Sequence, residues 1–332
     1  MSHRFYFAPL FSLALVATLS GQTTPAPAKH QPSAIARTPD GHPDLQGTWT
    51  NVTLTPMARL PQFNGKLNLT DAEAAAYENH QTEELKSADG KADADFHRRA
   101  GSGETGGYNA VFIDRGSELA RVDGVKRSSL IIDPPDGKMP AITAEAQARG
   151  RGARAGSTDS VKDRPLSERC LIGFGSTAGP PMLPVLYNNN YQIVQTPDAV
   201  VIQVEMIHDS RVVRMNSTHP PADVRKWLGD SIGHWEGDTL VVDTTNFNEH
   251  ISFRGSSQNL HVIERFSRSG PNALLYRATI DDPTTFTKSW TIEYPFMATP
   301  GPIYEYACHE GNYSITDILG GARKTESEAQ GK

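Results

Sequence analysis

The feature that most constrains this chain is a two-residue alternation of apolar and polar side chains, which runs through most of the sequence after Tyr187. Successive side chains of a β-strand point to opposite faces, so this alternation is typical of strands with one buried face. Short turn sequences such as the Thr-Pro-Asp at 196–198 separate the segments, as expected for antiparallel neighbours. The predicted strands cover 191–195, 199–208, a run ending at 215, 234–247 with a hairpin turn inside it, 259–268, 273–281, 288–296 and 303–310.

The predicted sheet is so large that it must close or fold over. Segments 45–52, 109–115 and 128–135 add further strands upstream of Tyr187. Hydrophobic residues make up 37% of the chain and charged residues 21%, a balance that excludes wholesale disorder. We therefore predict an all-β fold: an antiparallel lipocalin-like barrel, or a barrel-like closed meander, with a few short helices and long surface insertions.

Three helices are predicted beside the strands, the shortest of them covering 221–228. Thr70 and Glu73 form a capping box ahead of a run rich in Ala and Glu, so one helix covers about 71–86. Another follows Ser314, and the glycine pair at 320–321 breaks or ends it.

The first residues have the layout of a signal peptide, with Arg4, an apolar stretch from Phe5 to Leu19 and then small residues. This stretch is too short to span a bilayer, so no stable membrane insertion is expected after cleavage, and the protein is expected to be periplasmic or secreted. A net charge of −6 without a basic block excludes nucleic acid as a partner. The predicted organisation is a signal peptide (1–22), an extended Pro/Ala linker (23–42), a single β-barrel-like domain (43–325) with insertions near 87–107 and 136–186, and a flexible tail (326–332).

Cys170 and Cys308 are the two cysteines of the chain. Both follow the predicted signal peptide, and oxidising conditions outside the cytoplasm favour their pairing. We predict one disulfide between them; the alternative is two buried free thiols.

A set of distinctive segments begins near Pro43. They are PDLQGTWTN (43–51), SLIIDPPDG (129–137), RPLSERC (164–170), GPPMLP (179–184), YNNNYQIVQTPD (187–198), EMIHDSR (205–211), GHWEGDTLVVDTTNF (233–247), FRGSS (253–257), DDPTTFT (281–287) and IYEYACHEGNY (303–313). In these segments the chain resembles a large family of exported bacterial proteins of uncharacterised function, a resemblance that implies export and no particular activity. The Gly-Thr-Trp at 47–49 is also similar to the G-x-W opening of lipocalins, whose barrels enclose one small apolar ligand.

Alternation also identifies candidate catalytic residues. It puts His208 on an apolar inward face of 199–208, where an imidazole is either a general base or a hydrogen-bonded structural residue. Glu264 is the only polar side chain on the inward face of 259–266, and a buried carboxylate must be paired or protonated. Arg254 is the natural partner, either in a structural salt bridge or in a catalytic unit that grips an anionic or carbonyl group.

The predicted last strand, 303–310, places Tyr306 and Glu310 on one face and His309 on the other. Acids and a histidine at the end of a strand suit the rim of a pocket. We therefore take His309 as a catalytic candidate, and Tyr306 and Glu310 as ligand-binding candidates.

Three further residues are ligand-binding candidates. His234 precedes a hairpin turn and is either a pocket wall or a strand-end cap. Asn188 and Asn190 offer amide donors and acceptors to a polar ligand, although asparagine is also a common turn residue.

Motifs of several enzyme classes are missing from the sequence. It has no G-x-S-x-G, P-loop or dinucleotide fingerprint, and no H-E-x-x-H or C-x-x-C spacing. We therefore expect no cofactor and no metal, although His208, His234 and His309 with a carboxylate have the residue types of a zinc or iron site.

Two hypotheses about function follow. The first is an exported lyase or isomerase that moves a proton on a small hydrophobic or polyhydroxylated molecule, with His208 as the base assisted by Glu264 and Arg254. The alternative is a lipocalin-like binding protein without catalysis. A small molecule is the expected partner in both, and the sequence names no oligomeric state; a structural module of the cell envelope would need no such partner.

Overall fold

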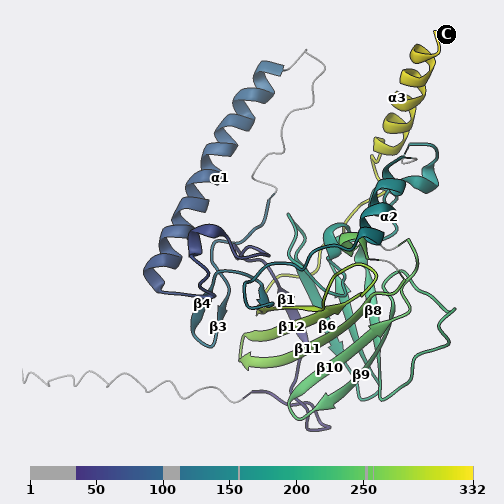
Figure 1. Ribbon diagram of the computed structural model, residues 1–332. Helices are drawn as coiled ribbons and strands as arrows, with labels where there is room; N and C mark the ends of the chain where they lie inside the picture. The colour runs from purple at the N-terminus through teal and green to yellow at the C-terminus, as the bar shows by residue number, and fades with distance from the viewer. Residues whose placement is uncertain (1–34, 100–112, 156–157, 251–252, 257, 332) are drawn as a thin grey trace, which may run out of the picture. The chain divides into compact units, whose positions relative to one another are not determined.

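The computed structural model describes residues 35–99, 113–155, 158–250, 253–256 and 258–331. In this part of the chain, nine strands form a closed barrel (Figure 1). The strands of the protein are β1 (Gly47–Thr50), β2 (Asn68–Leu69), β3 (Arg121–Val122), β4 (Val125–Arg127), β5 (Ile131–Asp133), β6 (Asn190–Gln195), β7 (Ala199–Val204), β8 (Ser210–Met215), β9 (Asp230–Glu236), β10 (Thr239–Thr245), β11 (His261–Gly270), β12 (Ala273–Asp281) and β13 (Trp290–Ala298).

The barrel follows chain order almost throughout, which confirms the predicted all-β barrel. Strands β6 to β13 pair in sequence, and β1 closes the ring between β13 and β6. Neighbours in the ring are antiparallel except β8 and β9, which are parallel. Because parallel strands cannot share a tight turn, the longer connection 216–229 joins this pair. One edge of β13 is shared, since it pairs with β1 at one end and with β5 at the other. Strands β2, β4 and β3 form a separate small sheet.

Large aromatic side chains fill the interior of the barrel. The ring of Tyr276 lies 5.1 Å from those of Phe266 and Phe296 and 5.8 Å from that of Tyr294, measured between centroids. All four residues are at most 1% exposed. The resemblance to lipocalins implies a ligand inside the barrel, but here protein side chains occupy that space because aromatic residues of adjacent strands meet at its centre.

Three α-helices lie outside the barrel in the described chain: α1 (Asp71–Arg99), α2 (Ala144–Ala155) and α3 (Ser314–Ala329). The predicted capping box is confirmed at the start of α1. The Glu73 N–H donates to Thr70 Oγ1 over 3.2 Å, and the Glu73 carboxylate accepts the Thr70 N–H over 2.9 Å. The helix continues beyond the predicted end near Lys86, into the insertion near 87–107, because alanines keep recurring there.

The prediction of a short helix at 221–228 was wrong, because this segment consists of turns and of a β-bridge between Lys226 and Phe247. The two remaining helices of the structure also differ from the expectations. Helix α2 lies within the predicted insertion 136–186. Helix α3 continues through the glycine pair at 320–321 to Ala329, so part of the segment expected to be a flexible tail is helical. A glycine inside a helix costs about 1 kcal/mol, which weakens a helix without ending it. Short 3₁₀ turns complete the set: η1 (Pro61–Phe63), η3 (Val161–Asp163), η4 (Phe174–Ser176), η5 (Met206–His208) and η6 (Phe253–Gly255).

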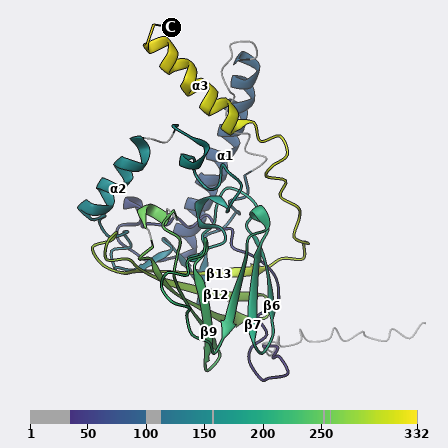
Figure 2. The same cartoon turned by 90° about the vertical axis from the view of Figure 1, so that its right-hand side faces the viewer.

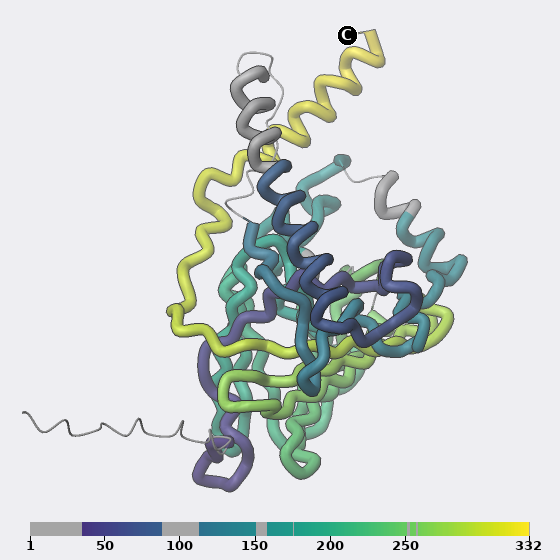
Figure 3. The backbone as a smooth tube through the Cα atoms, turned by 90° about the vertical axis from the view of Figure 1, so that its left-hand side faces the viewer, coloured from purple at the N-terminus to yellow at the C-terminus, as the bar shows by residue number. Residues whose placement is uncertain are grey.

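Two predicted strands were wrong in a way that affects the candidate site. The segment 199–208 is a strand only to Val204 and then turns, because Ile207 and His208 adopt left-handed backbone angles (φ 57° and 54°). The segment 303–310 forms no strand. Residues 299–313, which we call the strap, run outside the barrel from the end of β13 to the start of α3, in yellow in Figures 2 and 3.

The predicted signal peptide lies outside the described residues. The predicted strand 109–115 is described only from residue 113 on, and residues 113–115 form no strand. The end of the predicted extended linker folds back instead. Arg37 and Pro43 form a β-bridge, and Arg37 makes an ion pair with Asp238 at 2.7 Å, which holds the turn against the barrel. None of the helices in the described residues combines the length and apolar character needed to cross a membrane.

Candidate functional site

A loop of residues 173–184, which we call the plug, closes one end of the barrel. The hydroxyl of Tyr191 donates to Thr177 O over 2.8 Å, and that of Tyr294 donates to Met182 O over 2.9 Å. The Met182 N–H donates to the hydroxyl oxygen of Tyr276 over 2.9 Å. Thr177 and Met182 are fully buried. Interior tyrosines from the barrel wall therefore fix the backbone of the plug.

Glu264 points inward, as its alternation predicts, and is paired, but the predicted partner was wrong. The Arg211 guanidinium of β8 holds the Glu264 carboxylate in two hydrogen bonds of 2.7 and 2.9 Å. The Tyr276 hydroxyl donates a third, of 2.8 Å. Arg211 is 3% exposed and Glu264 is fully buried. Arg254 cannot reach this carboxylate because its turn, η6, lies outside the barrel interior at the pocket described next.

An apolar pocket of about 210 Å³ lies over the plug. Its described wall consists of residues 165–167, Ile172, part of the plug, Leu228, Phe247, and Phe253 and Arg254 of the turn η6. The described lining is apolar apart from Ser167, Ser176 and Arg254. Arg254 is thus the only charged residue in it.

A second, more open pocket of about 400 Å³ adjoins the first. Phe174, Leu183 and Arg254 line both pockets. The rest of the described lining of the open pocket consists of Thr53, Thr55, Met57, Arg115, Leu130 and residues 184–186. The two pockets therefore form one candidate site, with Arg254 at the boundary between them.

The turn that carries Arg254 is fixed by core contacts. Phe253 stacks on the buried Trp290, with 6.1 Å between ring centroids. Gly255 O accepts hydrogen bonds from Arg149 of α2 and from the Thr285 hydroxyl. Arg254 itself has left-handed backbone angles (φ 48°, ψ 34°), which are uncommon for a residue with a side chain. The surrounding structure therefore maintains this conformation and keeps the side chain at the pocket.

The electrostatics of Arg254 are unusual for this protein. Burial lowers the pKa of its guanidinium, and no carboxylate of the described residues offsets that effect. Burial also lowers the pKa of Arg59 and Arg268, but each of these has an aspartate close by that acts in the opposite direction. Arg254 is exposed and forms no hydrogen bond or ion pair with any described residue, so its guanidinium has no protein counter-ion among them.

The structure places Asn188, Asn190 and His208 around other partners. Asn188 Nδ2 donates to the Glu205 carboxylate over 2.8 Å, and Asn190 Nδ2 donates to it over 3.3 Å. His208 is exposed, not inward, and its Nε2 accepts the Tyr306 N–H over 3.1 Å. None of these three candidates is among the described residues lining either pocket.

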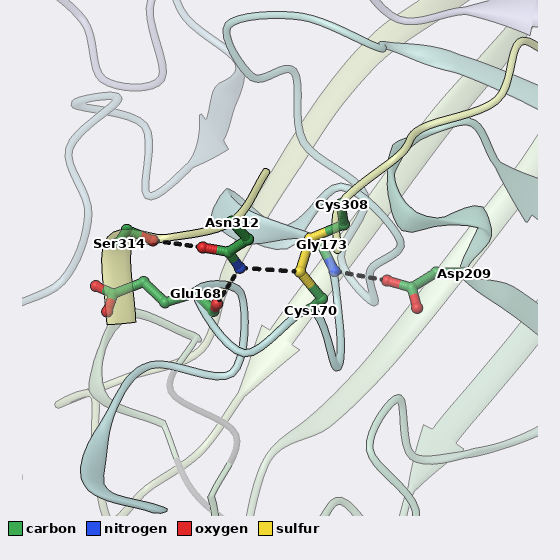
Figure 4. Close-up of a disulfide and its surroundings, with 7 residues drawn as sticks. All are labelled: Glu168, Cys170, Gly173, Asp209, Cys308, Asn312 and Ser314. Atoms are coloured by element: carbon green, nitrogen blue, oxygen red, sulfur yellow. Dashed lines mark hydrogen bonds between the residues drawn. A yellow bond between two sulfur atoms is a disulfide. The ribbon is translucent and has the colours of Figure 1, made fainter. Parts of the chain in front are cut away.

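The predicted disulfide is confirmed and ties the strap to the wall of the apolar pocket. Cys170 and Cys308 are joined with their Cα atoms 5.8 Å apart (Figure 4). Asn312 Nδ2 adds a hydrogen bond of 3.0 Å to Glu168 O. Three candidates lie on the strap: Tyr306 is half-buried and stacks on Tyr187, while His309 and Glu310 are exposed in a turn. The strap brings these candidates close to the pocket wall but not into its described lining.

Asp209 contacts the same wall and was not among the predicted site residues. Its carboxylate accepts the Gly173 N–H over 2.7 Å (Figure 4). Burial raises the pKa of Asp209 to about 6, although the hydrogen bond from Gly173 opposes the shift. At pH values between the pKa of Asp209 in the unfolded chain and its pKa of about 6 in the folded protein, the carboxyl is protonated mainly in the folded state. Asp209 therefore makes the free energy of unfolding fall as the pH rises through this range.

The variant Asp209→Asn is therefore expected to be more stable than the native protein at neutral pH. Asparagine removes the cost of a buried charge, while its Oδ1 still accepts the Gly173 N–H. The gain in the free energy of unfolding should be about 1–2 kcal/mol above about pH 6 and should vanish toward about pH 4. Urea denaturation across this pH range measures it, and a gain that does not change with pH would contradict the assignment.

The three histidines of the expected pocket lie apart. His234 is exposed on β9, and its Nε2 lies 3.2 Å from a carboxylate oxygen of Glu236. Another pair, His219 and His261, shares Asp243 on the outer wall, at 3.3 and 3.0 Å. In the part of the chain that the structure describes, no cluster of three or more His, Cys, Asp or Glu is arranged to hold a metal ion.

Sequence reasoning missed Arg211, although a signal for it exists. Arg211, Val213 and Met215 share one face of β8, and the latter two are buried. Alternation therefore put an arginine inside the barrel, opposite the predicted inward glutamate. Arg115 carries no such signal, because it lies in an irregular segment.

The candidate site thus consists of two adjoining pockets over a sealed barrel, with cationic side chains and no carboxylate in their described lining. In comparisons with known proteins, no family model matches the chain and no curated protein matches it.

Proposed function

We propose that this is an exported binding protein for a small amphipathic anion, such as an aliphatic or aromatic carboxylate. The apolar body of the ligand lies in the apolar pocket, and its anionic group is held by Arg254. The pocket, at about 210 Å³, is smaller than the roughly 300–1,000 Å³ typical of drug-sized ligands, so the ligand body is compact.

The observation that carries this proposal is the unpartnered guanidinium of Arg254 at the edge of an apolar wall. Arg254 is exposed at the pocket edge, so its guanidinium is open to an anion from solution, which would supply the missing counter-ion. Guanidinium holds a carboxylate through two parallel hydrogen bonds, which favours this anion. A ligand with both an apolar body and a carboxylate therefore satisfies the whole lining.

Binding without catalysis is favoured over the lyase or isomerase hypothesis because the described lining lacks a group that exchanges a proton near neutral pH. It contains no Asp, Glu, His, Lys, Cys or Tyr in either pocket. Glu264, the carboxylate expected to assist the base, is buried in its ion pair with Arg211. The proposed base, His208, is exposed and hydrogen-bonded to the strap.

A location in the periplasm or outside the cell is part of the same proposal. The signal-peptide layout of residues 1–22 and the resemblance to exported bacterial proteins support it. The disulfide between Cys170 and Cys308 supports it as well, because structural disulfides persist in oxidising compartments.

Isothermal titration calorimetry with benzoate and with the straight-chain acids from pentanoate to nonanoate tests the proposal. We expect at least one of these anions to bind, and Arg254→Gln to weaken that binding by about 10- to 100-fold, the value of one charge-assisted bidentate contact. Arg265→Gln, on the outer wall of the barrel, is the matched control and should leave the affinity unchanged. Absence of binding by every probe, or equal affinity in Arg254→Gln, would contradict the proposal.

A further inference from the structure

We propose that the ligand of this site is a dianion, an apolar chain or ring with a carboxylate at each end, whose second carboxylate binds Arg115 in the open pocket. This inference rests on the proposed function and names the chemical class of its ligand. It also assigns a specificity role to Arg115, which neither the sequence pattern nor the apolar pocket alone suggests.

Two arginines stand apart from the others in their contacts. Among the arginines whose side chains the structure describes, only Arg115 and Arg254 make no hydrogen bond or ion pair with a described residue. Both line the open pocket. Unpartnered guanidinium groups are thus concentrated at one place in the described chain, where a bound anion would meet both.

Arg115 is held in place by its backbone neighbours, as Arg254 is. The Asp114 N–H donates to Leu186 O over 2.7 Å, and Asn189 Nδ2 donates to Asp114 O over 3.1 Å. Asn189 is 1% exposed, so this connection is anchored in the protein interior. The position of Arg115 at the pocket is therefore built into the fold.

The threonine side chains of the open pocket already have hydrogen-bond partners within the protein. The Thr53 hydroxyl donates to Thr55 Oγ1 over 3.0 Å, and Thr55 Oγ1 accepts the Ala120 N–H over 2.7 Å. The described lining holds no carboxylate. The two guanidinium groups are therefore left to bind the ligand, and two positive charges facing one pocket favour a ligand with two negative charges.

The wall between the two cations determines the middle of the ligand. Phe174 and Leu183 line both pockets, so a ligand that extends from Arg254 toward Arg115 passes over apolar side chains. A polyhydroxylated spine would leave its hydroxyl groups without partners there, which is costly. The geometry therefore favours an apolar spine between the two carboxylates.

A matched series of probes tests this inference. The dicarboxylates from glutarate to azelate are titrated into the native protein, and each is compared with the monocarboxylate of the same carbon number, from pentanoate to nonanoate. We expect one chain length at which the dicarboxylate binds about 10-fold or more tightly than its monocarboxylate, since the second contact is also charge-assisted.

The variant Arg115→Gln should remove this advantage and change the affinity for the monocarboxylate by less than about two-fold, the scatter expected when a residue makes no contact. Arg115→Lys keeps the charge and should retain part of the advantage, while Arg265→Gln should retain all of it. Because Arg115 is exposed, these variants are expected to fold, and their circular dichroism spectra check that.

The possible failures are distinguishable. If monocarboxylates bind through Arg254 but no dicarboxylate binds more tightly, or if Arg115→Gln keeps the advantage, this inference is overturned and the proposed function stands. If neither series binds, or if binding ignores Arg254, the proposed function itself is overturned.

Discussion

Replacing Arg211 with methionine is expected to lower the free energy of unfolding by about 3–5 kcal/mol, the largest effect of any single substitution considered. The Glu264 carboxylate is fully buried and would keep only its hydrogen bond from Tyr276. An unpaired charge in the barrel interior is far more costly than the loss of one contact, because no water replaces the guanidinium. Urea denaturation, followed by circular dichroism and tryptophan fluorescence, measures the loss.

The matched control is Arg265→Met on the same barrel. Arg265 pairs with Glu236 at 2.7 Å, but the two side chains are 40% and 49% exposed, so that loss should be at most about 1 kcal/mol. The double variant Arg211→Met/Glu264→Gln should recover much of the stability, since the glutamine is neutral and still accepts the Tyr276 hydroxyl. If Arg211→Met costs no more than Arg265→Met, the buried pair does not have the energetic role assigned to it.

Removal of the disulfide is expected to have the second largest effect. Cys170 and Cys308 close a loop of 138 residues, for which the chain-entropy model gives an upper value of about 5 kcal/mol. The variant Cys170→Ser/Cys308→Ser should therefore lose about 2–5 kcal/mol of unfolding free energy. The effect arises mainly because the unfolded chain regains the freedom that the cross-link removes.

Reductant provides an internal control for the disulfide, because the chain has no other cysteines. It should destabilise the native protein to the level of the serine variant and leave the variant itself unchanged. Limited proteolysis of the variant should cut within the strap, which loses its covalent attachment to the wall of the apolar pocket. Equal stability of the oxidised protein and the serine variant would contradict this prediction.

Local patterns predicted the strands well. The segment 273–281 is a strand with the predicted bounds, and 191–195 begins one residue earlier than predicted. The capping box of Thr70 and Glu73 marks the start of α1. These features depend on neighbours within a few residues, so the information lies in the sequence itself. The end of α1 was misjudged because helix ends depend on weak propensities that the capping box does not influence.

The candidate site was harder to predict because its residues come together from distant segments. Alternation alone was sufficient to place Glu264 inside the barrel, but it could not show that Arg211, and not Arg254, reaches it. His208 was misplaced because two residues with left-handed backbone angles end β7 early, and nothing in the alternation signals such a turn. Asn188 and Asn190 were predicted to offer their amide groups to a ligand, but both donate hydrogen bonds to the buried Glu205 instead.

The sequence by itself determined the class of fold, the inward position of Glu264, the pairing of the two cysteines and the layout expected for export. Each follows from periodicity, from composition or from the small number of partners available. Only the tertiary structure decided which cations meet which carboxylates. Arg211 forms an ion pair with Glu264 inside the barrel, whereas Arg115 and Arg254 have no described partner and line one pocket. The reason is physical: charge pairing depends on distance in space and on the exclusion of water, and barrel closure sets both.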